Sequence, residues 1–119
     1  MRCLIVDDSA NFRDAASSML ERAGISVVGV ACNSAEALTR YRELRPDVTL
    51  VDVDLGAESG FDLAVQLDET ESPAPSVILI STHSEQDFAD MISSSPALGF
   101  LPKFALSPGA IRELLADKA

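Results

Sequence analysis

Residues 46–55 read PDVTLVDVDL and carry the clearest structural signal in the chain. The run from residue 48 to residue 53 is almost wholly apolar, which is typical of a strand buried on both faces at the centre of a parallel sheet. Close to its end this strand carries a carboxylate, Asp52. Burying a carboxylate costs free energy unless a partner compensates it. The segment therefore predicts a central strand that brings a functional carboxylate to the edge of a sheet.

On both sides of this segment, short apolar runs alternate with segments of helical periodicity, the pattern of a parallel sheet with helices on both faces. Five strands are expected, at residues 2–6, 25–31, 48–53, 76–80 and 98–101. Residues typical of helix starts stand at the head of five helical segments: Ser9, Asn33, Ser59, Ser84 and Ser107. The sequence thus predicts an α/β domain of three layers.

The helical segments place apolar residues at core spacing. Phe12 belongs to such a face in the first helix, which Gly24 ends. In the fourth helix, Phe88, Met91 and Ile92 have the same spacing and are expected in the core.

The chain has 119 residues, the size of one domain with its own core. It contains no repeat or linker, so residues 1–119 are expected to form a single domain with no output domain. The net charge of -10 argues against direct nucleic-acid binding, because phosphates repel an acidic protein. The chain has neither a signal-peptide pattern nor a spanning apolar stretch, so we expect a cytoplasmic protein without membrane contact. Cys3 and Cys32 stand in apolar segments and are expected to be free, buried thiols.

Polar side chains follow four of the expected strands. Asp7 and Asp8 follow the first strand, Asp52 lies near the end of the third, Ser81 follows the fourth, and Lys103 comes just after the fifth. Taken singly, most have ordinary explanations, such as an acidic helix start, a strand-end hydroxyl or a solvated lysine. Because parallel strands point the same way, however, all five side chains are expected to meet at one edge of the sheet.

Three converging carboxylates repel one another, and a raised pKa or a hard cation with oxygen ligands would relieve this. We expect Mg²⁺, or Mn²⁺ in its place, because such ions bind a few carboxylates together with phosphate oxygens. Asp52 could then attack phosphorus to give an aspartyl phosphate. Lys103 and Ser81 could contact the oxygens of the attached phosphoryl group.

Four segments together resemble the receiver domains of two-component response regulators, over essentially the entire chain: LIVDDS (4–9), PDVTLVDVDL with SG (46–60), VILIST (77–82) and GFLPK (99–103). The resemblance implies a flavodoxin-like, doubly wound (βα)5 fold with strand order 2-1-3-4-5. It implies that Asp52 is the phosphorylation site and that Asp7, Asp8, Asp52 itself and the backbone carbonyl of Asp54 bind the metal. Lys103 would be the family's lysine, and Ser81 and Phe100 its switch residues.

The resemblance also implies partners. A histidine kinase, a phosphotransfer protein or a small phosphodonor would supply the phosphoryl group, and the domain would catalyse only its own phosphorylation and dephosphorylation. On phosphorylation Ser81 would move toward the phosphoryl group and Phe100 would turn inward. The altered surface, comprising the fourth helix, fifth strand and fifth helix, would then bind an effector protein or form a homodimer.

Several positions depart from the usual family pattern. Gly56 stands where proline is common, which predicts a more mobile loop. The side chain of Asp54 could position the attacking water and shorten the phosphoryl lifetime. Thr82 is larger than the usual residue beside Ser81, and His83 next to it could make dephosphorylation depend on pH, although a surface role is the simpler reading.

Phe104 follows Lys103 where the family commonly has proline. A cis peptide bond between these two residues is therefore in doubt, because the non-proline cis form costs about 2.5 to 4 kcal/mol.

Three alternatives remain at this stage. Asp52 and Asp54 have the spacing of a haloacid-dehalogenase-type phosphatase, although that motif normally lies on a first strand. A flavodoxin-like cofactor module would share the architecture, but Asp7 and Asp8 would repel its phosphate. A degenerate receiver that signals without phosphorylation is the third alternative. It would not need the complete set of site residues that this chain has.

Overall fold

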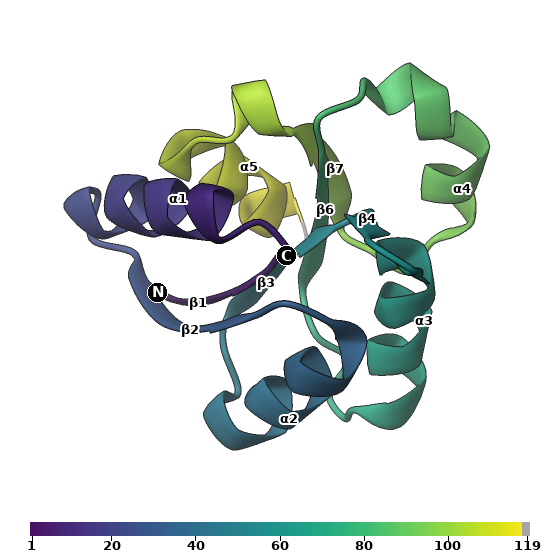
Figure 1. The fold of residues 1–119 in the computed structure, drawn as a ribbon, viewed down its shortest axis with the longest axis horizontal. Helices are drawn as coiled ribbons and strands as arrows, with labels where there is room; N and C mark the ends of the chain where they lie inside the picture. The colour runs from purple at the N-terminus through teal and green to yellow at the C-terminus, as the bar shows by residue number, and fades with distance from the viewer. Residues whose placement is uncertain (118–119) are drawn as a thin grey trace.

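The computed structural model describes residues 1–117 of the 119-residue chain and shows a parallel five-stranded sheet with helices on both faces (Figure 1). The sheet strands are β1 (Arg2–Val6), β2 (Ser26–Ala31), β3 (Val48–Asp52), β6 (Val77–Ser81) and β7 (Gly99–Pro102). Their spatial order is β2-β1-β3-β6-β7, which confirms the predicted order 2-1-3-4-5. The observed strand bounds lie within one residue of those predicted.

The helices are α1 (Ala10–Arg22), α2 (Ser34–Leu44), α3 (Gly60–Thr70), α4 (Ala89–Ser94) and α5 (Pro108–Asp117), and two 3-10 turns, η1 (Glu85–Phe88) and η2 (Lys103–Ala105), precede α4 and α5. Side-chain oxygens of four predicted helix-start residues accept hydrogen bonds from first-turn backbone N–H groups: Ser9, Asn33, Ser59 and Ser107. Gly24, in the left-handed region at φ 84°, follows α1 as predicted.

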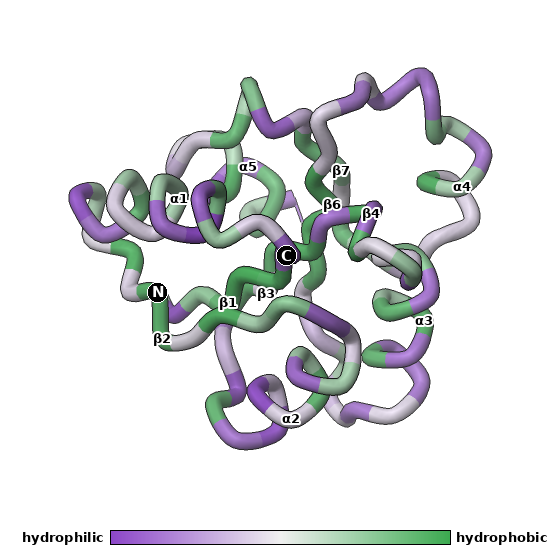
Figure 2. The backbone as a smooth tube through the Cα atoms, in the orientation of Figure 1, coloured by the Kyte–Doolittle hydropathy of each residue, from purple (hydrophilic) through white to green (hydrophobic). Residues whose placement is uncertain are grey.

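The sheet separates two apolar cores. Along β1, Leu4 and Val6 face the core under α2 and α3, while Cys3 and Ile5 face the core under α1 and α5. Figure 2 shows the corresponding run of hydrophobic residues through the central strands, with more polar helices outside. Every residue of β3 is buried, which confirms its predicted central position.

The fourth helical region differs from the prediction. It is a 3-10 turn followed by the six-residue helix α4, and Met91 is 49% exposed, so its prediction as a core residue was wrong. Phe88 and Ile92 do pack against the core. The structure also has a short antiparallel hairpin, β4 (Asp54–Leu55) and β5 (Glu58–Ser59), between β3 and α3, which was not predicted.

Both cysteines are free; Cys3 is buried as predicted, whereas Cys32 is only partly buried because it lies just beyond β2. Among the described residues the one cis peptide bond joins Ser72 and Pro73, so the bond after Lys103 is trans. Within residues 1–117, every helix is too short or too polar to span a membrane.

Candidate functional site

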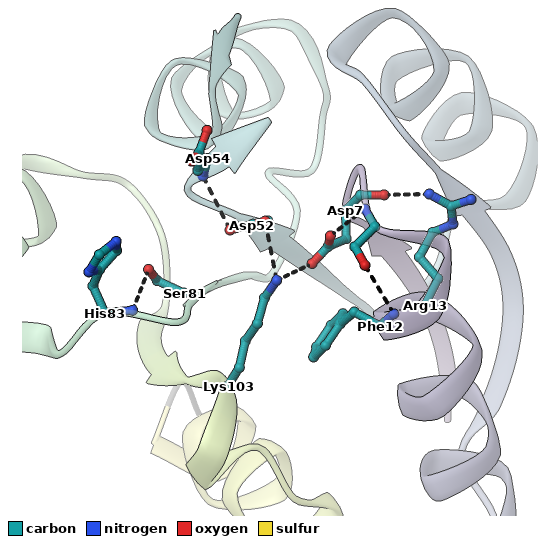
Figure 3. Close-up of polar contacts among 9 residues, drawn as sticks. Asp7, Phe12, Arg13, Asp52, Asp54, Ser81, His83 and Lys103 are labelled. Atoms are coloured by element: carbon teal, nitrogen blue, oxygen red, sulfur yellow. Dashed lines mark hydrogen bonds and ion pairs between the residues drawn. The ribbon is translucent and has the colours of Figure 1, made fainter. Parts of the chain in front are cut away.

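The carboxyl ends of the parallel strands bring the predicted polar residues to one edge of the sheet (Figure 3). Asp52 is the last residue of β3 and is 6% exposed, and Asp7, directly after β1, is fully buried. Ser81 ends the neighbouring strand β6, and Lys103 begins η2 directly after β7. The parallel sheet therefore places these side chains, from the ends of four strands, at one edge, as the sequence predicted.

Lys103 joins two of the carboxylates. Its Nζ lies 2.7 Å from Asp7 Oδ2 and donates a hydrogen bond to Asp52 Oδ2 at 3.3 Å. The same ammonium lies 4.2 Å from the centre of the Phe12 ring, in cation–π contact. Burial opposes its charge, but the close negative carboxylates of Asp7 and Asp52 outweigh this and raise the pKa of Lys103. It therefore remains a cation in the site.

Asp52 is held in a setting that disfavours its charge. Burial raises its pKa from the ordinary 3.8 to about 6, although the Asp54 backbone N–H, which donates to Oδ1 at 3.2 Å, opposes the shift. The charge of Asp7 adds to the rise, and Lys103 counteracts it. A positive charge brought to the site would therefore favour the carboxylate form of Asp52.

The acidic cluster fits a hard divalent cation. One carboxylate oxygen from each of Asp7, Asp8 and Asp52 lies within 4.8 Å of the others. Asp7 Oδ1 accepts a hydrogen bond from the Ser9 backbone at 2.8 Å, while its buried Oδ2 accepts none with good geometry despite the nearby Lys103 charge. An incompletely satisfied buried carboxylate oxygen beside two others is the donor set that Mg²⁺ or Mn²⁺ binds.

The predicted tuning residues lie around this centre. The Asp54 side chain is exposed, so only its backbone is engaged with Asp52. Thr82 and His83 are exposed, and the His83 backbone N–H donates to Ser81 Oγ at 3.0 Å. Gly56, in the hairpin turn, adopts the left-handed region at φ 73°. These residues thus lie close enough to affect the site, while their effect on phosphoryl lifetime stays a prediction.

An aromatic row connects the site to the surface. Phe100 is 7% exposed and thus already turned inward in this structure. Its ring centre lies 6.2 Å from that of Phe88, which in turn lies 5.7 Å from Phe61 and 6.0 Å from His83. Such centroid separations are favourable for aromatic pairs. A change in the position of the Phe100 ring would therefore alter its contact with Phe88, and through Phe88 the packing of α3 and α4.

Two residues of this neighbourhood were missed as site residues. Phe12 and Phe88 were identified only as core residues of their helices. The sequence did contain a signal that Phe12 lies near the site, because Phe12 stands in the first turn of the helix that follows Asp7 and Asp8. That turn must lie at the same edge of the sheet as the carboxylates.

Comparison with known proteins agrees with this geometry. The family model for the response regulator receiver domain matches residues 3–116. The chain is 30% identical over 114 residues to the chemotaxis protein CheY of Thermotoga maritima, covering 96% of this chain and 93% of that protein. It superposes on the signal receiver domain of the putative response regulator NarL of Mycobacterium tuberculosis with a TM-score of 0.83 and 30% identity, covering 98% and 94% of the two chains.

The chain is also 45% identical over 83 residues to a protein-glutamate methylesterase/protein-glutamine glutaminase of Methanosarcina acetivorans, covering 69% of this chain and 23% of that protein. Across several such relatives it spans between 23% and 36% of their length. These similarities support the phosphoacceptor role and do not favour the phosphatase alternative. The matched model, the sheet order and the acidic edge together place this chain in the family of response regulator receiver domains of two-component signalling.

Proposed function

We propose that Asp52 is the residue that accepts the phosphoryl group. The observation that carries this proposal is the setting of its carboxylate, which is buried at the end of the central strand, hydrogen-bonded to Lys103 and close to Asp7 and Asp8. Asp8 is exposed, so the cluster opens to solvent on its side. A phosphodonor can therefore reach the site from that direction.

In the proposed reaction a carboxylate oxygen of Asp52 forms a bond to phosphorus while the bond from phosphorus to the donor breaks, and the donor leaves with the bonding electrons. Asp7, Asp8 and Asp52 would hold the divalent cation, with the Asp54 backbone carbonyl as a further ligand. When bound, Mg²⁺ neutralises negative charge on phosphoryl oxygens. Lys103 is placed to pair with a phosphoryl oxygen, and Ser81 to donate its hydroxyl hydrogen to another.

The donor in this proposal is a histidine kinase, a phosphotransfer protein or a small phosphodonor. The chain acts only on itself and turns over no external substrate apart from the donor. Phosphorylation would shift the packing of Ser81 and Phe100 and so change the surface made by α4, β7 and α5, where an effector protein or a second copy would bind. The contact of Phe100 with Phe88, directly before α4, supports this route.

The test is incubation with acetyl phosphate and Mg²⁺, followed by intact mass analysis. The wild type should gain one acid-stable, base-labile phosphoryl group, and Asp52→Asn should gain none. Asp68→Asn, an exposed carboxylate in α3, is the matched control and should label normally. Undiminished labelling of Asp52→Asn would contradict the proposal, and steady turnover of a generic phosphomonoester would favour the phosphatase alternative instead.

A further inference from the structure

The charges of this chain are divided unevenly. All nine Lys and Arg residues lie outside residues 46–102, whereas eleven of the nineteen Asp and Glu residues lie inside that segment. The segment contains β3, α3, β6, α4 and β7. The α3 and α4 side of the molecule is therefore strongly acidic, and it attracts cations over distances of about a Debye length.

The helices α3 and α4 are neighbours on this side of the molecule (Figure 1). An apolar groove is lined by residues of both helices. Its volume is about 340 Å³, and its apolar lining comes from Phe61 and Val65 of α3 and Met91 of α4. Val65 is 40% exposed and Met91 49% exposed, so apolar surface faces solvent within the groove. We call this feature the α3–α4 groove.

Two carboxylates also line the groove, one from each helix. Asp62 of α3 and Asp90 of α4 are both exposed. Within residues 1–117, neither of them forms an ion pair with a Lys or Arg side chain. An apolar centre with unpaired negative charge beside it is complementary to a segment that carries apolar anchors flanked by cations.

We propose that the α3–α4 groove binds a cationic amphipathic helix of another protein. Apolar side chains of that helix would contact Phe61, Val65 and Met91, while its Lys or Arg side chains would pair with Asp62 and Asp90. A nucleic acid or an anionic lipid surface would be repelled by this side of the molecule. A second copy of the chain would bring two acidic grooves together, which like-charge repulsion opposes.

Contacts also connect the groove with the proposed phosphorylation site. Phe61 lines the groove and contacts Phe88, which contacts Phe100. The backbone at the head of α3 is tied to the site as well, because the Gly60 N–H donates to the Val53 carbonyl at 2.9 Å, one residue after Asp52. Phosphorylation should therefore change affinity at the groove, and by reciprocity occupancy of the groove should change the phosphorylation equilibrium. This coupling rests on the proposed function, whereas docking itself does not.

The docking test titrates ¹⁵N-labelled protein with a 14-residue Leu/Lys amphipathic helical peptide and follows amide signals by NMR. Signals of α3 and α4 around Phe61, Val65 and Met91 should move, and a Leu/Glu peptide of the same pattern should move none. Shifts spread over the whole surface would overturn the proposal. Concentration-dependent broadening of the same signals without peptide would identify a second copy as the occupant and would also overturn it.

Two pairs of matched variants test whether the peptide binds at the α3–α4 groove. Val65→Thr should weaken peptide binding about fourfold through loss of one buried methyl group, while Val30→Thr, at an equally exposed valine of β2, should not. Asp90→Asn should weaken binding about twofold, while Asp14→Asn, an exposed carboxylate of α1, should not. Equal losses in a groove variant and its control would contradict docking at the groove.

Coupling is tested by repeating the titration with beryllofluoride and Mg²⁺, which imitate the aspartyl phosphate. Peptide affinity should change in the wild type and stay constant in Asp52→Asn. Beryllofluoride that shifts the amide signals around Asp52 but leaves peptide affinity unchanged would overturn the coupling alone. Failure of beryllofluoride to shift those signals would instead count against the proposed function, with docking judged separately from the first titration.

Discussion

At the scale of single residues, the reactivity proposed for Asp52 comes from its neighbours. Burial disfavours its charged form, the Asp54 backbone N–H orients one oxygen, and Lys103 bonds the other. Lys103 is itself positioned, because its ammonium contacts Asp7 and the Phe12 ring as well. Each of these contacts can be altered without removing the carboxylate of Asp52.

Phe12 is expected to act as a positioning residue for Lys103. Phe12→Leu keeps an apolar side chain but removes the aromatic face, a contact worth about 0.5 to 2 kcal/mol. Labelling with acetyl phosphate should therefore slow by roughly threefold or more, measured by time-resolved intact mass. Phe12→Tyr retains the ring and should label at close to the wild-type rate. Equal slowing in both variants would point to altered packing of α1 and contradict a role for the ring.

Asp54 is expected to shorten the phosphoryl lifetime. Its exposed carboxylate lies two residues after Asp52, where it can accept a proton from a water that attacks the phosphoryl group. Asp54→Asn keeps the backbone contact with Asp52 and should slow loss of the phosphoryl group by about tenfold, followed by mass after removal of the donor. The Asp68→Asn control should lose the group at the wild-type rate. An unchanged rate of phosphoryl loss in Asp54→Asn would contradict this hypothesis.

The carboxylates, Ser81 and Lys103 could be predicted from sequence because their place depends only on where parallel strands end. The contact of Phe12 with Lys103 could not, because it depends on how α1 is rotated and on a side-chain rotamer. The inward position of Phe100 could not be predicted either, because it too depends on a side-chain rotamer. Sequence thus locates the site but not the packing around it.

At the scale of elements, the junction between β3 and α3 is unusually tight. A Cβ atom added at Gly60 would overlap the backbone carbonyl oxygen of Asp52. Glycine at the start of α3 therefore lets the helix approach the end of the central strand. The same approach places Phe61 between the site and the α3–α4 groove.

Gly60→Ala is expected to destabilise the fold by about 2 kcal/mol or more, because the backbone it meets cannot move without displacing β3. Gly109→Ala in α5 is the matched control. A Cβ there meets nothing closer than Ser107 Oγ at 3.9 Å, so alanine should stabilise the helix by about 0.5 to 1 kcal/mol. Urea unfolding measures both. Equal stability of the two variants would contradict the tight junction.

The elements themselves were largely predictable, since apolar runs and helix-start residues agree along the chain. The fourth helix is the exception. Ser84 and Asp87 form a reciprocal capping pair around a 3-10 turn, and Ser93 to Pro96 then end α4 after six residues. A helix this short has no complete buried face, which explains why Met91, at core spacing, is exposed. Spacing predicts burial only where the helix is long enough to pack.

At the scale of the whole molecule, the Glu71 carboxylate forms ionic contacts between the acidic segment 46–102 and basic residues outside it, as Asp52 does with Lys103. Glu71 directly follows α3, and its side chain pairs with Arg42 of α2 at 3.0 Å and with Arg45 at 3.5 Å. The Arg42 hydrogen bond lowers the pKa of Glu71 below its usual 4.5. This contact holds the acidic segment 46–102 against the basic residues Arg42 and Arg45.

The stability of the fold should therefore depend on Glu71 in a pH-dependent way. Because its folded-state pKa is depressed, the carboxylate contributes stability above pH 4.5, and this contribution disappears as pH falls through the folded pKa. Glu71→Gln should be less stable than the wild type at pH 7 and approach it in acid, measured by thermal unfolding from pH 3 to 7. Glu69→Gln, exposed in α3, should show no such trend. A pH-independent difference would contradict the ionic role.

The central claim is that Asp52 carries the phosphoryl group. The most direct measurement is borohydride reduction of protein treated with acetyl phosphate and Mg²⁺, which converts a phosphorylated aspartate to homoserine, followed by peptide mass mapping. Homoserine should appear at position 52 and only when a divalent cation is supplied. Homoserine at position 7, 8 or 54 instead, or its absence from protein that has gained a phosphoryl group, would contradict the claim.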